Sequence, residues 1–418
     1  MQWLLVCFYS ALVCFCISRM KFFKSSEIKI KWWCGIFLFK VLIGILYGYI
    51  HSFSYGGADT FYSFKQGIRV YNTLRNFGFS TYFKLVFLPC HYPSYSGIER
   101  WTHNSIPYGD ESYYLIVRFH AFVALISGCY YNVHVVFYNI LSFAGCVFLY
   151  RSFKDELIEK SILLLAALIL IPSVVFWTSG IHKDGLSLLG IGILFYSLKK
   201  QDEFSFYKIV LALFSIILLY IVRSYILLIL IPLIAVYVIF SNKKKNLLLY
   251  YAITFSGFLF IVILVSSDVG GVSPLDKIVW WKNAFGALSQ SENSISLPDI
   301  QPKIFSFIQL IPHALVHSFL QPFFWNAKNG YQIFVGLQDW ILFFSLQILI
   351  IYSVIKQKVL PHLFYLSVGY TVSVYVLLGM IVPNLGALSR YKSSGTFFLV
   401  LAIISLLPNE FMKRIDKH

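Results

Sequence analysis

The chain has few charged residues for its length, and this scarcity limits what kind of protein it can be. Only 12% of its 418 residues are Asp, Glu, Lys or Arg, whereas 58% are hydrophobic. A soluble domain of this length carries about twice that charged fraction. Together with the mean hydropathy of +0.73, the composition excludes an ordinary soluble domain and predicts a protein that crosses a membrane many times.

Several enzyme motifs are also missing. The sequence has no Gly-rich nucleotide loop, no HExxH sequence and no paired CxxC motif, and its seven cysteines lack metal-ligand spacing. We therefore assign no metal ligands, and we expect no cytoplasmic enzyme that uses nucleotide sugars. The net charge of +16 fits basic cytoplasmic loops of a membrane protein, so we expect membrane lipids and no nucleic acid as partners.

The apolar run at 1–18 has no basic residue before it, and five basic residues follow it between positions 19 and 31. A secretory signal peptide has the reverse order. The pattern predicts a retained first helix with its N-terminus outside the cell, and the positive-inside rule then places the basic clusters in the cytoplasm. These clusters lie at 19–31, 151–160, 199–200, 243–245, 356–358 and 413–418.

Eleven apolar stretches are candidates to span a membrane, since about 20 apolar residues cross a ~30 Å hydrocarbon core. We predict an all-α polytopic bundle of about 11–13 helices, forming a single integral-membrane domain over 1–418, with the C-terminus in the cytoplasm. The candidate spans are about 2–18, 32–52, 131–150, 161–178, 185–198, 206–222, 225–240, 247–266, 333–355, 359–382 and 395–408.

Two long segments, about 53–112 and 267–332, are predicted to lie outside the membrane. Both are rich in aromatic residues, which argues against disorder and favours short helices on the outer leaflet. The apolar stretch 113–128 carries Arg118 and His120. We do not assign it to a membrane span or to an outer segment.

Four polar clusters fall on the predicted outer side. The first is the sequence GGADTFY, residues 56–62, which contains Asp59. A carboxylate at a helix end beside flexible glycines is suited to act as a general base or to bind a cation. The same Asp is also suited to cap the helix that follows, and the sequence leaves both interpretations open.

The second cluster, PSVVFWTSGIHKDG at 172–185, joins two apolar runs with almost no loop. Ionisable groups near a membrane face are costly and usually functional. His182 titrates near neutral pH in its ordinary state, and Lys183 is suited to meet a phosphate as a point charge. The alternative is a simple turn in which Asp184 caps the next helix.

The third cluster is Arg223-Ser224-Tyr225, the polar break between the runs 206–222 and 225–240, which we expect to form a tight hairpin. A guanidinium fits a lipid-linked phosphate, although a lone Arg can also extend to lipid head groups. The fourth is 384–392, where Arg390 and Tyr391 precede the last span. These two residues are suited to bind substrate or to serve as an interfacial anchor.

Together, the clusters bring an acid, a histidine and several cations to one membrane face. A site for a phosphate-bearing lipid donor needs cations for the phosphate and an acid for a hydroxyl acceptor. The sequence therefore predicts such a site on the outer side of the membrane.

With these four segments, the chain resembles the GT-C superfamily of integral-membrane glycosyltransferases. Asp59 in GGADTFY matches the essential acid in the first outer loop of that superfamily. PSVVFWTSGIHKDG, VRSY and NLGALSRYK resemble segments of membrane proteins from bacterial capsule and exopolysaccharide clusters. The resemblance implies a protein of the bacterial cytoplasmic membrane that acts in surface polysaccharide biosynthesis.

The resemblance also implies the reaction and the roles of the residues. A sugar would pass from a polyprenyl-phosphate donor to a glycan or lipid-linked acceptor on the outer face of the membrane. The single Asp, where the superfamily often has a carboxylate pair, leaves the use of a divalent cation open. Asp59 would activate the acceptor hydroxyl, while His182, Lys183, Arg223, Arg390 and Tyr391 would bind the substrates.

Two alternatives remain. A polysaccharide polymerase or ligase also has many helices and outer arginines, but it joins preassembled units. A flippase or transporter of lipid-linked oligosaccharide would have charges near the bilayer midplane and broken helices in two related halves.

Overall fold

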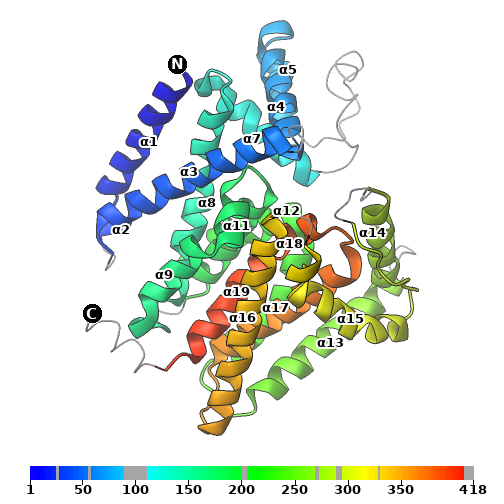
Figure 1. Cartoon of the computed structure of the whole chain (residues 1–418). Coiled ribbons are helices and arrows are strands. Elements are labelled where there is room, and N and C mark those ends of the chain that lie inside the picture. Colours follow the sequence, from blue (N-terminus) through cyan, green and yellow to red (C-terminus); the bar gives the residue numbers. More distant parts are fainter. Residues whose placement is uncertain are drawn as a thin grey trace. The chain divides into compact units, whose positions relative to one another are not determined.

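A computed structural model describes most of the chain (Figure 1). In this described part, helices are the only regular secondary structure, apart from one isolated β-bridge between Ser294 and Asn384. The all-α prediction is therefore confirmed. The described residues are 1–24, 28–54, 58–88, 111–199, 205–243, 245–268, 273–288, 294–327 and 330–408.

Several predicted features lie outside the described residues. They include the glycines at 56 and 57, the part of the first outer segment at 89–110, and the basic C-terminal cluster at 413–418. Lys200 and Lys244 of the predicted cytoplasmic clusters also fall outside them.

Six described helices are long and apolar enough to cross a membrane. They confirm the expectation of a polytopic helical protein, although several other predicted spans are shorter than expected. The six are α1 (Gln2–Arg19), α3 (Ile30–Ser54), α8 (Tyr131–Phe153), α12 (Phe206–Ile239), α16 (Gly330–Ile355) and α17 (His362–Ile381).

The predicted span 161–178 is broken. It consists of α9 (Ser161–Leu170) and α10 (Pro172–Ser179), which are bent by 56° and together form at most one further span. Proline favours the first position of a helix and cannot donate the backbone hydrogen bond that would continue α9. Hydropathy alone did not reveal this break, because Pro172 lies inside an apolar run.

Five further predicted spans are also short or interrupted. The predicted span 185–198 corresponds to α11 (Lys183–Ser197), whose 15 residues measure about 22 Å. The runs 206–222 and 225–240 both lie in α12, and the backbone is non-helical at Arg223. The shorter apolar helices include α13 (Leu247–Asp268), with a described apolar part of 247–261, and α19 (Ser393–Leu406).

The two predicted outer segments contain helices, as expected, although their position at a membrane surface stays a prediction. The first contains α4 (Ala58–Asn76) and α5 (Phe79–Phe87). The second contains α14 (Pro274–Leu288) and α15 (Ile304–Leu320).

The chain forms two compact units, which we describe separately. Unit 1 comprises 1–152 and 175–224, and unit 2 comprises 153–174 and 225–418. The single membrane domain expected from the sequence stays a prediction.

One end of unit 1 collects basic side chains, and we call it the basic end. Arg151 at the end of α8 donates to the carbonyl of Phe22 in α2 (Lys21–Lys24). Lys199, just after α11, donates to the Arg151 carbonyl at 2.9 Å, and Lys208 donates to the Lys199 carbonyl at 2.8 Å. Three of the predicted cytoplasmic clusters therefore meet here.

The opposite end of unit 1, which we call the site end, contains the starts of α4, α7 (Glu111–Ser127), α8 and α11. Thr60 Oγ1 lies 2.8 Å from the hydroxyl of Tyr131, and Lys183 Nζ lies 2.5 Å from Ser112 Oγ. Because α8 and α11 both run from these contacts to the basic end, the two ends lie on opposite sides of the unit.

The segment 113–128, which the sequence left unplaced, forms most of α7 and packs against α4 and α5. The hydroxyl of Tyr82 donates to the Ala121 carbonyl at 3.2 Å, and that of Tyr114 donates to the Leu85 carbonyl at 3.0 Å. α7 thus belongs to the packed interior of unit 1.

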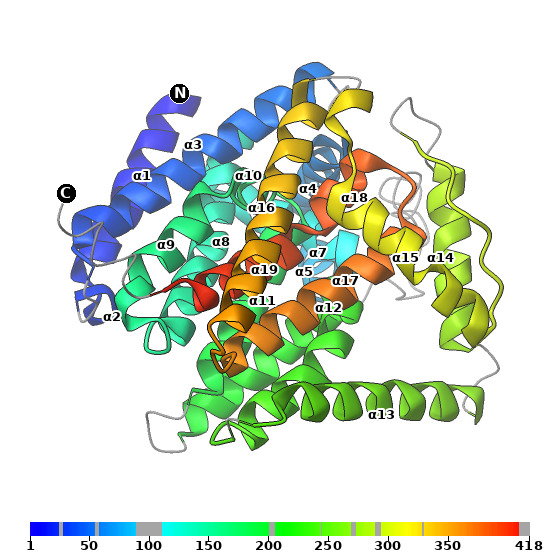
Figure 2. The ribbon, with the colours of Figure 1, turned by 60° about the horizontal axis from the view of Figure 1, so that its bottom comes forward.

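Basic residues also meet at one end of unit 2. At its basic end, His362 Nε2 lies 2.7 Å from the Lys243 carbonyl, and Lys160 donates to the Ser405 carbonyl at 3.3 Å. At the other end, the link between α17 and α18 (Leu385–Tyr391) contacts the chain before α15, where Ile295 N–H donates to the Pro383 carbonyl at 2.6 Å. Figure 2 shows α16, α17 and α19 of this unit.

Candidate functional site

The link between α10 and α11 is buried and closely packed. The Tyr138 hydroxyl of α8 donates to the carbonyl of His182, and the His182 ring meets Tyr47 edge-on, with centroids 5.5 Å apart. A Cβ at Gly180 would lie 2.6 Å from the Tyr47 ring, and one at Gly185 would lie 2.7 Å from the Thr178 carbonyl. Both positions therefore require glycine.

Asp184 and Arg223 form a buried ion pair. Arg223 Nη2 donates to Asp184 Oδ1, and the two residues are 7% and 4% exposed. The Arg lies at the single non-helical position of α12, and the Asp lies in the first turn of α11, where the helix dipole favours a carboxylate. The guanidinium is thus paired with an acid of unit 1, and its extension to lipid head groups stays a prediction.

Lys183 is the first residue of α11, and it directly precedes Asp184 of the ion pair. Its side chain is half-buried, and it bonds Ser112 at the start of α7. The segment that contains His182 and Lys183 thus contacts Arg223 through Asp184, and the meeting of His182, Lys183 and Arg223 at one substrate site stays a prediction.

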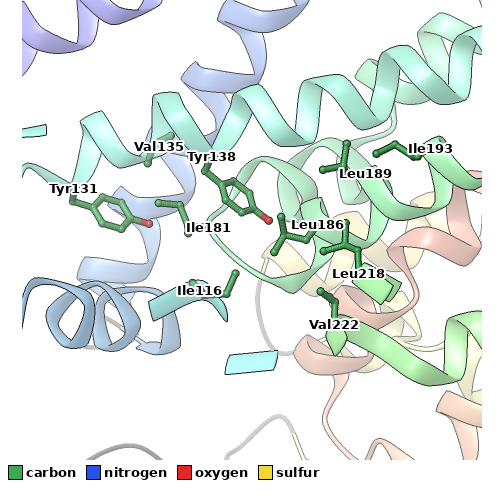
Figure 3. Close-up of a cluster of buried hydrophobic side chains, with 10 residues drawn as sticks. All are labelled: Ile116, Tyr131, Val135, Tyr138, Ile181, Leu186, Leu189, Ile193, Leu218 and Val222. Atoms are coloured by element: carbon green, nitrogen blue, oxygen red, sulfur yellow. The ribbon is translucent and has the colours of Figure 1, made fainter. Parts of the chain in front are cut away.

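Asp59 lies at the same end of unit 1. It is exposed in the first turn of α4, and the next residue, Thr60, anchors that helix start to Tyr131 of α8. Tyr131 and Tyr138 are two helical turns apart, about 10 Å along α8. Figure 3 shows Ile181 between these two rings, so α8 connects the start of α4 with the turn that contains His182.

Arg390 and Tyr391 belong to unit 2. The guanidinium carbon of Arg390 lies 5.4 Å from the Tyr391 ring centre, and that ring packs edge-on against Phe285 of α14 at 5.8 Å. Because these residues and Arg223 belong to different units, their predicted meeting at one cavity stays a prediction.

A second buried ion pair lies in unit 2, and the sequence analysis did not find it. Lys392 Nζ lies 2.5 Å from Asp339 Oδ2 and 2.9 Å from the Ser318 carbonyl. The signal was an acid within the apolar run 333–355, because ionisable residues inside membrane spans are rarely without a role.

A third buried cation, Lys40 of α3, was also missed. Its ammonium donates to Thr178 Oγ1 at 3.0 Å and to Ser179 Oγ at 3.2 Å, at the end of α10. The sequence signal for this site was a lysine in the middle of the apolar run 32–52.

A pair of buried histidines lies between α7 and α8. His120 Nδ1 and His134 Nδ1 are 3.0 Å apart, and Ser127 Oγ lies 2.7 Å from His134 Nε2. Burial, and then the neighbouring His134, lower the pKa of His120 well below its ordinary value.

No group of three or more His, Cys, Asp and Glu side chains suited to hold a metal ion is found among the described residues.

Comparisons with protein-family models, curated proteins and solved structures found no significant match to this chain.

Proposed function

We propose that the chain is an integral-membrane glycosyltransferase. It would move a sugar from a polyprenyl-phosphate donor to a glycan or lipid-linked acceptor on the outer face of the membrane, in surface polysaccharide biosynthesis. The observation that supports this proposal is the buried Asp184–Arg223 ion pair at the site end of unit 1, directly after Lys183 in the sequence, whose ammonium contacts Ser112. Two cations at the start of a helix, among apolar helices, suit the phosphate of a lipid donor.

Arg223 and Lys183 would bind the donor phosphate. Asp184 orients the guanidinium from one side, and a planar guanidinium can offer a phosphate two parallel N–H groups. Lys183 adds a point charge, and His182, whose carbonyl is fixed by Tyr138, lies next to it. In unit 2, Arg390 and Tyr391 would contact the substrates as well.

Asp59 would act as the general base. Its carboxylate takes the proton of the acceptor hydroxyl, and the acceptor oxygen forms a bond to the anomeric carbon of the sugar. The bond between that carbon and the phosphate oxygen breaks at the same time. The electron pair leaves with polyprenyl phosphate, whose additional negative charge is stabilised by Lys183 and Arg223. The proposed mechanism routes no step through a metal ion.

A second candidate is a transporter of an anionic lipid-linked sugar. Two structural observations favour it: the 56° break between α9 and α10, and the non-helical position of Arg223 within α12. Broken helices with buried charges form the binding sites of many transporters.

Analysis of lipid-linked intermediates distinguishes these functions. A strain that lacks the protein should accumulate repeat units missing a sugar, whereas loss of a polymerase or a transporter leaves complete units. The wild-type gene should restore the missing sugar, but Asp59→Asn and Arg223→Lys should not, because they remove the base and the paired N–H donors, respectively. A general base contributes roughly 10²–10⁴-fold to a rate.

Arg75→Lys is the matched control. Arg75 is exposed near the end of α4 in the same unit, so this variant should restore the sugar fully at equal membrane levels. Complete repeat units in the deletion strain would reject sugar transfer, and full activity of Asp59→Asn would assign that residue to helix capping alone.

A further inference from the structure

Lys40 lies at a depth of α3 where a charge is difficult to accommodate. The helical rise puts it about 15 Å from Ile30 and about 21 Å from Ser54, the two ends of the helix. The residue has 0% exposure. A lysine near the centre of a span cannot reach water by extending along the helix. Its ammonium therefore needs partners inside the protein.

These partners are oxygen atoms at the end of α10. Lys40 donates to the hydroxyls of Thr178 and Ser179, the last two residues of that helix. In the described part of the chain, no carboxylate pairs with it. The carboxyl end of a helix carries a partial negative charge, which favours a cation at this position.

α8 completes the same group. Ser142 Oγ donates to the Thr178 carbonyl at 2.6 Å, and Asn139 Nδ2 donates to the Ser179 carbonyl at 3.0 Å. The other side-chain atom of Asn139, Oδ1, is buried and has no hydrogen-bond partner among the described residues. A buried acceptor of this kind is costly unless a donor or a cation satisfies it.

We propose that the end of α10 is a monovalent-cation site, in which the hydroxyl oxygens of Thr178 and Ser179 bind the tethered ammonium of Lys40. Asn139 Oδ1, which lacks a hydrogen-bond partner among the described residues, is a further ligand for a free cation that replaces this ammonium. Hydroxyl and amide oxygens are ligands that hard cations prefer, and helix carboxyl ends hold cations in broken membrane helices. This inference does not depend on the proposed sugar transfer.

Chemical rescue tests the proposal. In Lys40→Ala, the missing atoms correspond to n-propylammonium, which can be added to the purified full-length protein in detergent. We expect the variant to unfold several degrees below wild type. Propylammonium should restore more than half of that loss, and the effect should grow with the logarithm of its concentration. 1-Propanol, which has a similar shape but no charge, should restore little.

Two further variants complete the test. Ser142→Ala loosens the same helix end without removing the charge, so propylammonium should not raise its unfolding temperature. Lys40→Met fills nearly the same volume without the cation, and it should also unfold below wild type. Equal rescue by propanol, or a Lys40→Met protein at least as stable as wild type, would overturn the cation site.

Discussion

At the scale of single residues, the Asp184–Arg223 pair is the central feature of unit 1. Burying two charges is expensive, and the pair repays that cost only while both partners are present. Replacing a buried pair by apolar residues is often neutral, whereas removing one partner leaves a buried charge without compensation. This asymmetry allows stability and function to be measured separately.

Asp184→Ala should destabilise the protein by about 3–5 kcal/mol, because it leaves Arg223 buried without its partner. The double variant Asp184→Ala/Arg223→Met should recover much of this loss, since neither charge remains. Thermal unfolding in detergent, followed by tryptophan fluorescence, measures both effects.

Sugar transfer should behave differently from stability. The double variant should be folded but inactive, because Arg223 is proposed to hold the donor phosphate. A double variant that restores the missing sugar would show that the pair is only structural.

At the scale of helices, the turn between α10 and α11 determines where the candidate residues lie. Side chains of α3 and α8 bind the end of α10, and the aromatic rings of Tyr47 and Tyr138 pack against the turn. The position of Lys183 therefore depends on contacts from helices that are distant in sequence.

Gly180→Ala should disturb this turn, because the added Cβ would lie 2.6 Å from the Tyr47 ring. Overpacking of this kind typically costs 1–3 kcal/mol. Gly35→Ala, on the exposed side of α3, is the control: nothing lies within 4 Å of its added Cβ, and alanine favours a helix by roughly 0.5–1 kcal/mol. Gly180→Ala should therefore unfold at a lower temperature than wild type, whereas Gly35→Ala should unfold at the same or a higher temperature. Equal temperatures for the two variants would contradict the packing argument.

The sequence predicted the helical class and the apolar stretches, because both follow from composition along the chain. It also pointed to the segments of Lys183 and Arg223, because both are short polar breaks between apolar runs. The structure joins them through Asp184, which the sequence offered only as a helix cap, and the meeting of His182, Lys183 and Arg223 at one site stays a prediction. It missed the partners of Lys40 and Lys392, because each cation contacts a helix far away in sequence. Hydropathy averages cannot identify such pairs, although an ionisable residue inside a span is a usable warning.

At the scale of the whole molecule, each unit gathers basic residues from separate predicted cytoplasmic clusters at one end. In unit 1, Arg151, Lys199 and Lys208 meet at one end, and Asp59, Lys183 and Arg223 lie at the other. The positive-inside rule associates such basic ends with the cytoplasm. The proposed outer site requires this orientation, and an inverted protein could not use an acceptor outside the cell.

Cysteine labelling in intact cells tests this orientation most directly. In a background without the seven native cysteines, single cysteines would replace Asn76, an exposed residue of the predicted outer segment 53–112, and Lys243, at the basic end of unit 2. A membrane-impermeant maleimide should label the cysteine at position 76 in intact cells and the cysteine at position 243 only after the membrane is opened. Labelling of position 243 from outside, with position 76 protected, would contradict an outer site.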